Sequence, residues 1–423
     1  MTDIIAVITY SSMILLYTSW LVIFILPSRR ATGKPPFPKI SVILPAHNEE
    51  KSISNTINSL LKASYPSKKE IIVVDDGSTD STAKIVKEFS KNNRDVRLIQ
   101  VKHGGKSNAI NFAAKLASND VIVVLDADSM VDTDSLKEIV KPLADEKVGA
   151  STGFVRARHS KNPLTWFQDL EYITSSGWRY VTNKIDMPSV LPGIVAYKKD
   201  VLIKVGGFSR DVLTEDFDIT LKLKKAGYKT RMAPSAVVYT DVPKTLSGIV
   251  KQRIRWGRGT IQTLRKHSDL LFSKKGGIMG SYTLPTQAYW YFFAWIFLPI
   301  TLYSLISQYF KYFVLNNNIF SIASFKYFFA WFTTYGMAET LQRVFTGYYR
   351  VDLVLGLIIV TFFLSALYLL LLILKFTKPT FRHLLAFFFF FPYCMFVLFV
   401  QAFVLLREVV IKQKVRNIWE KNK

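Results

Sequence analysis

The sequence predicts an α/β protein, in which a largely parallel sheet covered by helices is inserted between membrane-spanning helices. Short apolar runs alternate with amphipathic stretches from residue 38 to residue 240. Two of these runs, 71–74 and 121–125, end abruptly in aspartates. Long uncharged runs lie before and after this region, and a chain of 423 residues exceeds one ordinary domain.

The first expected element is a spanning helix within residues 1–30. The run from Ile4 to Leu26 carries no charge. At about 1.5 Å per residue it is long enough to cross a hydrocarbon core of about 30 Å. A secretory signal would begin with basic residues and have a shorter apolar run. Arg29, Arg30 and Lys34 follow the run, so the positive-inside rule predicts that residue 30 is cytoplasmic.

The soluble region, residues 38–240, is expected to begin with a strand and then to alternate strands with helices. Ligands of parallel sheets bind outside the carboxyl ends of the strands. The acidic residues that follow these strands should therefore meet at one edge of the sheet. The expected strands are Lys39–Pro45, Ile71–Val74 and Val121–Leu125, and the expected helices are one from near Ser52, then Ser81–Lys91, Ser107–Leu116 and Phe217–Ala226.

The C-terminal part is expected to be helical and mostly apolar. Residues 242–275 are basic, and the region 241–287 predicts amphipathic, interfacial helices that end near Pro285. About four spans follow within 288–406, at Ala288–Ser307, Phe320–Ala338, Leu353–Leu374 and Leu384–Leu406. Lys326 interrupts the second, but counting it gives five spans in all and places the basic tail 407–423 in the cytoplasm.

Contact with membrane lipids explains the high positive net charge. The net charge is +24, yet no nucleic-acid recognition motif accompanies it. Many basic residues lie beside apolar runs, where they would meet anionic head groups. We therefore expect lipid partners and no nucleic acid. The single cysteine, Cys394, excludes a disulfide framework within one chain and a cysteine-based metal site.

Two acidic motifs follow predicted strands. Asp126 and Asp128 are separated by one residue, and such a pair can hold a hard divalent cation that also binds phosphate oxygens. The alternative is an ordinary polar turn. Asp75 and Asp76 precede Gly77, and their carboxylates can accept hydrogen bonds from a nucleobase or ribose. The alternative is that this segment only caps the following helix.

Two further motifs lie on predicted helices. Thr214, Glu215 and Asp216 could simply place negative charge at a helix start. On one helical face, Gln252, Arg255 and Trp256 would present an amide, a guanidinium and an indole ring. That face suits a diphosphate and a sugar, and it also suits an interfacial helix with a tryptophan at the head-group level.

These four motifs, in this order, resemble the processive, membrane-embedded branch of glycosyltransferase family 2, which includes synthases of cellulose, hyaluronan and poly-N-acetylglucosamine. The resemblance covers roughly residues 38–260 and implies a GT-A-like catalytic domain. It also implies inverting transfer from a nucleotide sugar, UDP-N-acetylglucosamine or UDP-glucose, to a glycan, with Mg²⁺ or Mn²⁺ as cofactor. The catalytic domain would be cytoplasmic in a multi-pass protein of the cell membrane, with accessory subunits as further partners.

The resemblance also implies roles for single residues. Asp216 would be the general base, with Glu215 supporting it. Asp128 would bind the metal directly, and Asp126 would contact the ribose or the metal shell. The remaining expected contacts are Pro45, Ala46 and Glu49 around the base, Lys106 toward the donor, and Gln252, Arg255 and Trp256 around the diphosphate and acceptor. A surface lysine is the alternative for Lys106.

Two residues are expected to stay outside the chemistry. His47 is expected to be an exposed loop histidine, and Asp218 to face solvent or to cap its helix. Two other functions compete with the synthase. One is a single-transfer glycosyltransferase acting on a polyisoprenyl phosphate or diacylglycerol, which would use the same nucleotide motifs. The other is a transporter, which would require buried charges along a membrane pathway, and apart from Lys326 the apolar runs offer almost none.

Overall fold

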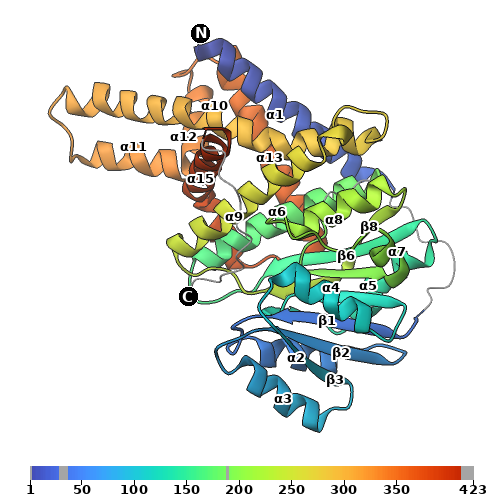
Figure 1. The fold of residues 1–423 in the computed structure, drawn as a ribbon. Helices are drawn as coiled ribbons and strands as arrows, with labels where there is room; N and C mark the ends of the chain where they lie inside the picture. The colour runs from blue at the N-terminus through green and yellow to red at the C-terminus, as the bar shows by residue number, and fades with distance from the viewer. Residues whose placement is uncertain (1, 28–36, 187–189, 411–423) are drawn as a thin grey trace.

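The computed structural model describes residues 2–27, 37–186 and 190–410. The soluble region is built on one eight-stranded sheet with the order β3-β2-β1-β4-β7-β6-β8-β5. Figure 1 shows this sheet below a group of long helices. The strands are β1 (Ile40–Ala46), β2 (Lys69–Asp76), β3 (Val96–Val101), β4 (Val121–Leu125), β5 (Ser129–Val131), β6 (Val148–Ala157), β7 (Ile194–Lys198) and β8 (Lys229–Thr240).

Most strand pairs are parallel, as predicted. β1 pairs in parallel with β2 and β4, β2 with β3, and β6 with β8, whereas β7 is antiparallel to β4 and β6, and β5 to β8. β1 is buried along its whole length, because helices cover both faces of such a sheet. Its alternate residues enter two cores: Leu44 packs with Ile57 of α2 on one face, and Ile43 packs with Ile110 of α4 on the other.

The helices of the soluble region lie on these two faces, and α6 lies between the sheet and the apolar helices. Leu170 and Ile173 of α6 pack with Phe154 of β6 on one side and with Leu372 of α13 on the other. The helices of this region are α2 (Ile53–Lys62), α3 (Thr82–Asn92), α4 (Lys106–Leu116), α5 (Ser135–Val140), α6 (Leu164–Lys184), α7 (Lys199–Lys204) and α8 (Glu215–Lys225).

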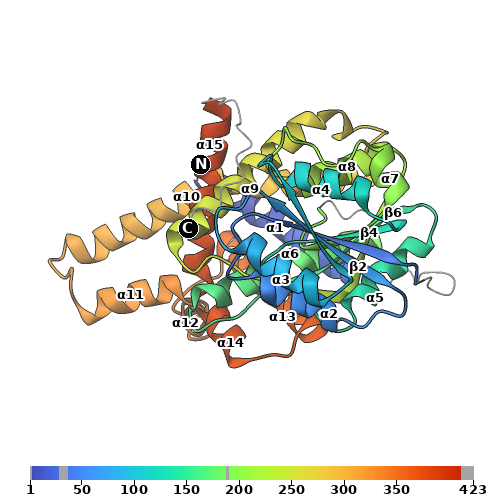
Figure 2. The same cartoon turned by 60° about the horizontal axis from the view of Figure 1, so that its bottom comes forward.

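Four helices in the described part of the chain are long and apolar enough to cross a membrane: Asp3–Ile25, Met279–Val314, Leu353–Phe376 and Phe390–Glu408. In Figures 1 and 2, α10 and α11 project side by side away from the sheet. The remaining helices are α1 (Thr2–Ile25), α9 (Leu246–Lys266), α10 (Leu284–Tyr309), α11 (Ile322–Phe332), α12 (Tyr335–Phe345), α13 (Leu353–Phe376), α14 (Phe381–Phe388) and α15 (Phe390–Val410).

The predicted span Phe320–Ala338 is not one helix. α11 ends at Phe332, and Thr333 after it is extended. The turn is tight, because a Cβ on Gly336 would lie 2.1 Å from the Ala330 carbonyl oxygen. Each of the two helices, α11 and α12, has 11 residues, too few to cross a bilayer. The described residues therefore give four candidate spans, where the sequence predicted five.

Two predicted boundaries also shift. Pro285 lies inside the continuous helix Met279–Val314, just after the π-helical turn Met279–Thr283, and does not end an interfacial segment. The expected run 384–406 is divided between α14 and α15 near Phe389. Arg29, Arg30, Lys34 and the tail beyond residue 410 lie outside the described residues, so the side of the membrane that they occupy stays a prediction.

Candidate active site

Lys106 joins two acidic motifs that are far apart in the sequence. Its ammonium group lies 2.7 Å from Asp126 Oδ1, after β4, and 2.8 Å from Glu215 Oε1, at the start of α8. Burial opposes the lysine charge, but the two carboxylates hold the pKa of Lys106 above its usual range. Lys106 is therefore an internal member of the site, and the alternative of a surface lysine is wrong.

The chain places Lys106 through a glycine turn and a buried carboxylate. Gly105, directly before α4, has a positive φ of 87°, a conformation that glycine adopts without strain. Its N–H group and that of Gly104 each donate to Asp76, at 2.9 Å. Asp76 therefore fixes the turn from which Lys106 reaches the other two motifs.

Glu215 and Asp216 are neighbours with opposite pKa shifts. Burial alone would raise the pKa of Glu215, but Lys106 lowers it below its usual range. Burial, followed by the charge of Glu215, raises the pKa of Asp216 to about 6. Asp216 lines a cavity and is only partly buried. A carboxylate with such a pKa can take a proton near neutral pH.

Asp218 neither faces solvent nor caps its helix, whose N-cap is Thr214, so that prediction is wrong. It is fully buried and accepts hydrogen bonds from Ser209 Oγ at 2.6 Å and from His267 Nε2 at 2.9 Å. Lys266 Nζ lies 3.0 Å from the same carboxylate. Asp218 therefore ties α8 to the end of α9.

Asp128 lies beside a second carboxylate, Asp241, which belongs to none of the four sequence motifs. Asp128 Oδ1 accepts from the hydroxyl groups of Ser129 and Thr240, both at 3.3 Å. Asp241 directly follows β8, and burial raises its pKa, with Arg158 opposing and Asp128 adding to the shift. Two carboxylates that line one cavity and repel each other fit a divalent cation. Asp241 could have been found from the sequence, because it directly follows the strand β8 (Lys229–Thr240), as Asp126 follows β4.

Gln252, Arg255 and Trp256 of α9 line the same cavity. Between them, Arg253 is buried, lies 2.5 Å from Glu171 Oε2 of α6, and places its guanidinium carbon 4.3 Å from the Trp256 ring centroid. Arg253 therefore holds α9 against α6. Arg255 has no ion pair among the described residues, so its charge is available to a ligand.

One cavity of about 380 Å³ contains these groups and extends to the apolar helices. Its wall includes Tyr172, Trp178 and Arg179 of α6, none of which the sequence motifs indicated. Gln287 of α10 and Gln401 of α15 also line it, and both belong to candidate membrane spans. The predicted site residues in its lining are Lys106, Asp126, Asp128, Glu215, Asp216, Gln252, Arg255 and Trp256.

The predicted base-binding residues lie at the same sheet edge, outside the residues that line this cavity. Ala46 and Asp75 are partners in the register of β1 and β2. A carboxylate stabilises the loop after each of these two strands. Asp75 Oδ1 accepts a hydrogen bond from the Ser78 N–H group at 3.0 Å, and Glu49 accepts one from the Ser52 hydroxyl at 2.7 Å. A role in binding the base stays a prediction for Pro45, Ala46, Glu49, Asp75 and Asp76.

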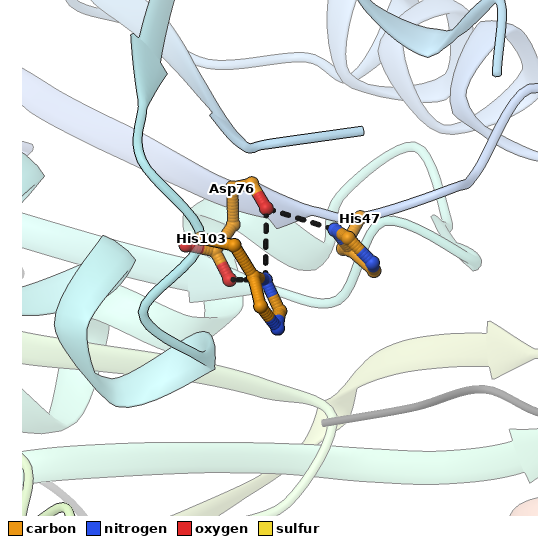
Figure 3. A group of neighbouring side chains, drawn as sticks. All are labelled: His47, Asp76 and His103. Carbon is orange, nitrogen blue, oxygen red and sulfur yellow. Dashed lines mark hydrogen bonds and ion pairs between the residues drawn. The ribbon is translucent and has the colours of Figure 1, made fainter. Parts of the chain in front are cut away.

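His47 belongs to a small cluster with Asp76 and His103 (Figure 3). Nδ1 of His47 lies 2.8 Å from the Asp76 carbonyl oxygen, and Nδ1 of His103 lies 2.9 Å from Asp76 Oδ2. The three could hold a metal ion by geometry, but the Asp76 carboxylate already accepts two backbone N–H groups. His47 is half-buried and not exposed as predicted. Its contact with the Asp76 carbonyl oxygen holds its loop in place.

Parts of the chain are similar to known proteins. Residues 41–206 match the family profile described as "Glycosyl transferase family 2". Poly-beta-1,6-N-acetyl-D-glucosamine synthase of Staphylococcus aureus (strain COL) is 34% identical over 228 residues, 53% of this chain and 55% of that protein. The synthase of Staphylococcus epidermidis is 34% identical over 229 residues, with the same shares. The chain thus spans about half the length of these curated relatives.

A solved structure is similar over most of the chain. It is a mannosyltransferase from Pyrobaculum calidifontis in complex with GDP-Man and Mn²⁺. The similarity covers 89% of this chain and 98% of that protein, with a TM-score of 0.58 and 24% sequence identity. At this identity the similarity concerns the fold, and it supports a GT-A-like sheet flanked by apolar helices.

Proposed function

We propose, from the premise that residues 41–206 form a glycosyl transferase family 2 domain, that this chain is a processive polysaccharide synthase of the membrane. It transfers a sugar from a nucleotide sugar, with UDP-N-acetylglucosamine or UDP-glucose favoured, to a growing β-linked polymer. One observation carries the proposal: a single cavity is lined by Asp128 and Asp216, by the Gln252–Trp256 motif, and by Gln287 and Gln401 of two candidate spans.

The proposed reaction is a single inverting displacement. Asp216 accepts the proton of the acceptor hydroxyl while that oxygen forms a bond to the anomeric carbon. The bond between this carbon and the diphosphate oxygen breaks, and the nucleoside diphosphate leaves. Arg255, which has no ion pair among the described residues, meets the developing charge. Lys106 keeps Glu215 ionised, so that Glu215 supports the base without competing for the proton.

A divalent cation, Mg²⁺ or Mn²⁺, fits this arrangement. Asp128 would hold it directly, with Asp126 and Asp241 at the edge of the shell, because Asp126 pairs with Lys106 and Asp241 pairs with Arg158. When bound, the ion neutralises the leaving diphosphate. The similar mannosyltransferase structure contains Mn²⁺, which supports a divalent cation as cofactor.

The acceptor is proposed to enter from the membrane side of the cavity. The indole of Trp256 lies 6.0 Å from the Tyr172 ring, and the two rings offer stacking faces to a pyranose. Gln287 and Gln401 supply hydrogen-bonding groups toward the spans. We propose that the polymer leaves between the spans and that the domain is cytoplasmic. Single transfer to a lipid is the alternative, since it would use the same donor site.

The decisive experiment is product sizing. The purified protein in lipid is incubated with Mg²⁺ or Mn²⁺ and a panel of labelled nucleotide sugars. We expect a high-molecular-weight product that one β-glycanase degrades. A product that consists of one sugar on a lipid would replace the synthase by the single-transfer enzyme, and no transfer from any donor would contradict both.

A further inference from the structure

Gln252, the first residue of the α9 motif, has an amide whose orientation the neighbouring arginine determines. Its Oε1 atom accepts a hydrogen bond from Nη1 of Arg253. A guanidinium group has only N–H donors and no acceptor, so the amide must turn its oxygen toward Arg253 and its NH2 group away. Gln252 lines the cavity and is only partly buried. It therefore offers a hydrogen-bond donor, and not an acceptor, to a molecule in the cavity.

Arg253 is itself held by residues of two other helices. Its Nη2 atom donates to Glu171 Oε2 of α6 at 2.5 Å and to the hydroxyl oxygen of Tyr393 of α15 at 3.3 Å. The Tyr393 hydroxyl in turn donates to the same Glu171 oxygen. Arg253 is 4% exposed and Tyr393 is 6% exposed, so water competes little for these hydrogen bonds. The three side chains join the soluble domain, the motif helix and a candidate membrane span.

Aromatic packing fixes the position of the Tyr393 hydroxyl. The Tyr393 ring stacks on Phe167 of α6, with the ring centroids 5.5 Å apart and the planes at 13°. It also stacks on Phe390 of its own helix, at 5.9 Å and 28°. These ring contacts do not depend on the hydroxyl group. The substitution Tyr393→Phe therefore removes hydrogen bonds from the network and leaves the packing in place.

Helix α15 also packs on α9 beyond the motif. Gly257 lies so close to this helix that a Cβ would be 2.9 Å from Val404 Cγ1. One turn further along α9, Ile261 shares a buried core with Val400 and Val404. Gln401, between these two valines, lines the cavity. Because packed side chains transmit small shifts, a displacement of α15 would move the motif helix and the cavity wall together.

We propose that Glu171, Arg253 and Tyr393 are positioning residues for the acceptor end of the growing polymer. They hold Gln252 so that its amide donates a hydrogen bond to an oxygen atom of the terminal sugar. The same guanidinium lies over the Trp256 ring and fixes the face on which that sugar stacks. The network ties these two contacts to a membrane span. This inference rests on the proposed function, because it concerns the acceptor side of the same cavity, and it predicts an effect on polymer length and none on donor binding.

Oligosaccharide binding and product length test the positioning role. The probes are fluorescent pentamers of β-linked N-acetylglucosamine and of β-linked glucose, titrated with UDP and Mg²⁺ into the full chain in nanodiscs. We expect Tyr393→Phe to weaken binding of the pentamer that wild type prefers by about 3- to 10-fold, and to shorten the polymer. UDP affinity and the donor KM should stay within about twofold of wild type. Tyr327→Phe, which removes a hydrogen bond to the Leu305 carbonyl oxygen outside this cavity, is the matched control and should behave as wild type.

Further variants test the orientation of the amide. Gln252→Glu keeps an oxygen for Arg253 but has no N–H group to donate, so it should lose as much pentamer affinity as Gln252→Ala. Arg253→Lys should recover part of the affinity that Arg253→Met loses. Lysine can pair with Glu171, but it lacks the planar fork that reaches Gln252 and Tyr393 as well. Thermal unfolding and UDP affinity show whether each variant folds, and Tyr393→Phe decides the question if Arg253→Met does not fold.

The outcomes separate this inference from the proposed function. If wild type makes polymer, and Tyr393→Phe and Gln252→Glu keep both its length and the pentamer affinity, the positioning role is wrong and the proposed function stands. An equal loss of UDP and pentamer affinity in Tyr393→Phe would indicate a general change in the fold and would also contradict the role. If wild type makes no polymer and binds neither pentamer, the proposed function fails and the acceptor contacts fail with it.

Discussion

Lys106 Nζ lies 2.8 Å from Glu215 Oε1, whereas the adjacent Asp216 has no ion pair within the described part of the chain. Two consecutive acids thus have different electrostatic surroundings. Glu215 is kept ionised, and its charge, with burial, raises the pKa of Asp216 to about 6. Pairs of carboxyl groups with separated pKa values mark the division of catalytic roles. This contact between α4 and α8 therefore distinguishes the supporting acid from the proposed base.

Replacing the lysine should disturb both acids. In Lys106→Met, Asp126 and Glu215 lose their cation, so the pKa of Glu215 rises and the site loses stability. We expect a loss of about 2 kcal/mol, less than for a fully buried pair, and a turnover reduced by roughly 10- to 100-fold. Thermal unfolding in detergent and labelled-sugar transfer measure the two effects. Lys102→Met, at an exposed position, is the control; identical behaviour of the two variants would remove the proposed role of Lys106.

Replacing the base should separate binding from chemistry. Asp216→Asn keeps the shape of the side chain but cannot accept the hydroxyl proton. We expect transfer to a sugar hydroxyl to fall by roughly 10²- to 10⁴-fold, with UDP affinity within about twofold of wild type as measured by calorimetry. Asp211→Asn, at an exposed carboxylate, should transfer at the wild-type rate. Retained turnover in Asp216→Asn would assign the base to another residue.

The raised pKa of Asp216 predicts a pH dependence. The charged form is the active base, and it is lost as the pH falls through about 6. The value of kcat/KM should therefore be level above pH 7 and fall about tenfold per unit well below pH 6. The residual activity of Asp216→Asn should lack this inflection. An inflection that is the same in wild type and variant would mean that another group titrates.

The sequence predicted the sheet and the motif positions well, because both follow from local patterns. The apolar runs before Asp75 and Asp126 are strands β2 and β4, since runs of this kind are buried on both faces of a parallel sheet. The carboxyl ends of parallel strands lie at one edge of a sheet. The sequence alone therefore predicted that Asp126, after β4, lies close to the end of β1, and these two strands do pair in parallel.

The sequence-based predictions were wrong where contacts between segments that are distant in the sequence determine the structure. Asp218 is buried because Ser209 and His267 approach it from other parts of the chain, and no pattern near Asp218 reports them. Hydropathy could not detect the break at Thr333 within the predicted fourth span. Arg179 carries no motif, and only the packing of α6 between sheet and spans turns it toward the cavity.

Metal dependence can be tested at Asp241, the carboxylate that the motifs missed. We expect chelation by EDTA to abolish transfer, and added Mg²⁺ or Mn²⁺ to restore it. Asp241→Asn should raise the metal concentration needed for half-maximal activity by roughly 10- to 100-fold. Its saturated rate should fall less than that of Asp128→Asn. An unchanged metal requirement in Asp241→Asn would restrict the cation site to the Asp126 and Asp128 motif.

Gly259 of α9 controls how closely that helix approaches the catalytic loop. A Cβ at this position would lie 2.5 Å from Thr214 Cγ2 and 2.8 Å from the Thr214 backbone nitrogen, and the backbone cannot rotate away as a side chain could. Gly259→Ala should therefore displace α9 from the loop that leads into Glu215, with a loss of about 1–3 kcal/mol and a turnover reduced at least tenfold. Gly356→Ala in α13 is the control, because its Cβ would meet only ordinary contact at 3.6 Å and alanine favours a helix. Transfer assays and thermal unfolding compare the two variants, and a fully active Gly259→Ala would show that the distance between α9 and the catalytic loop does not govern the reaction.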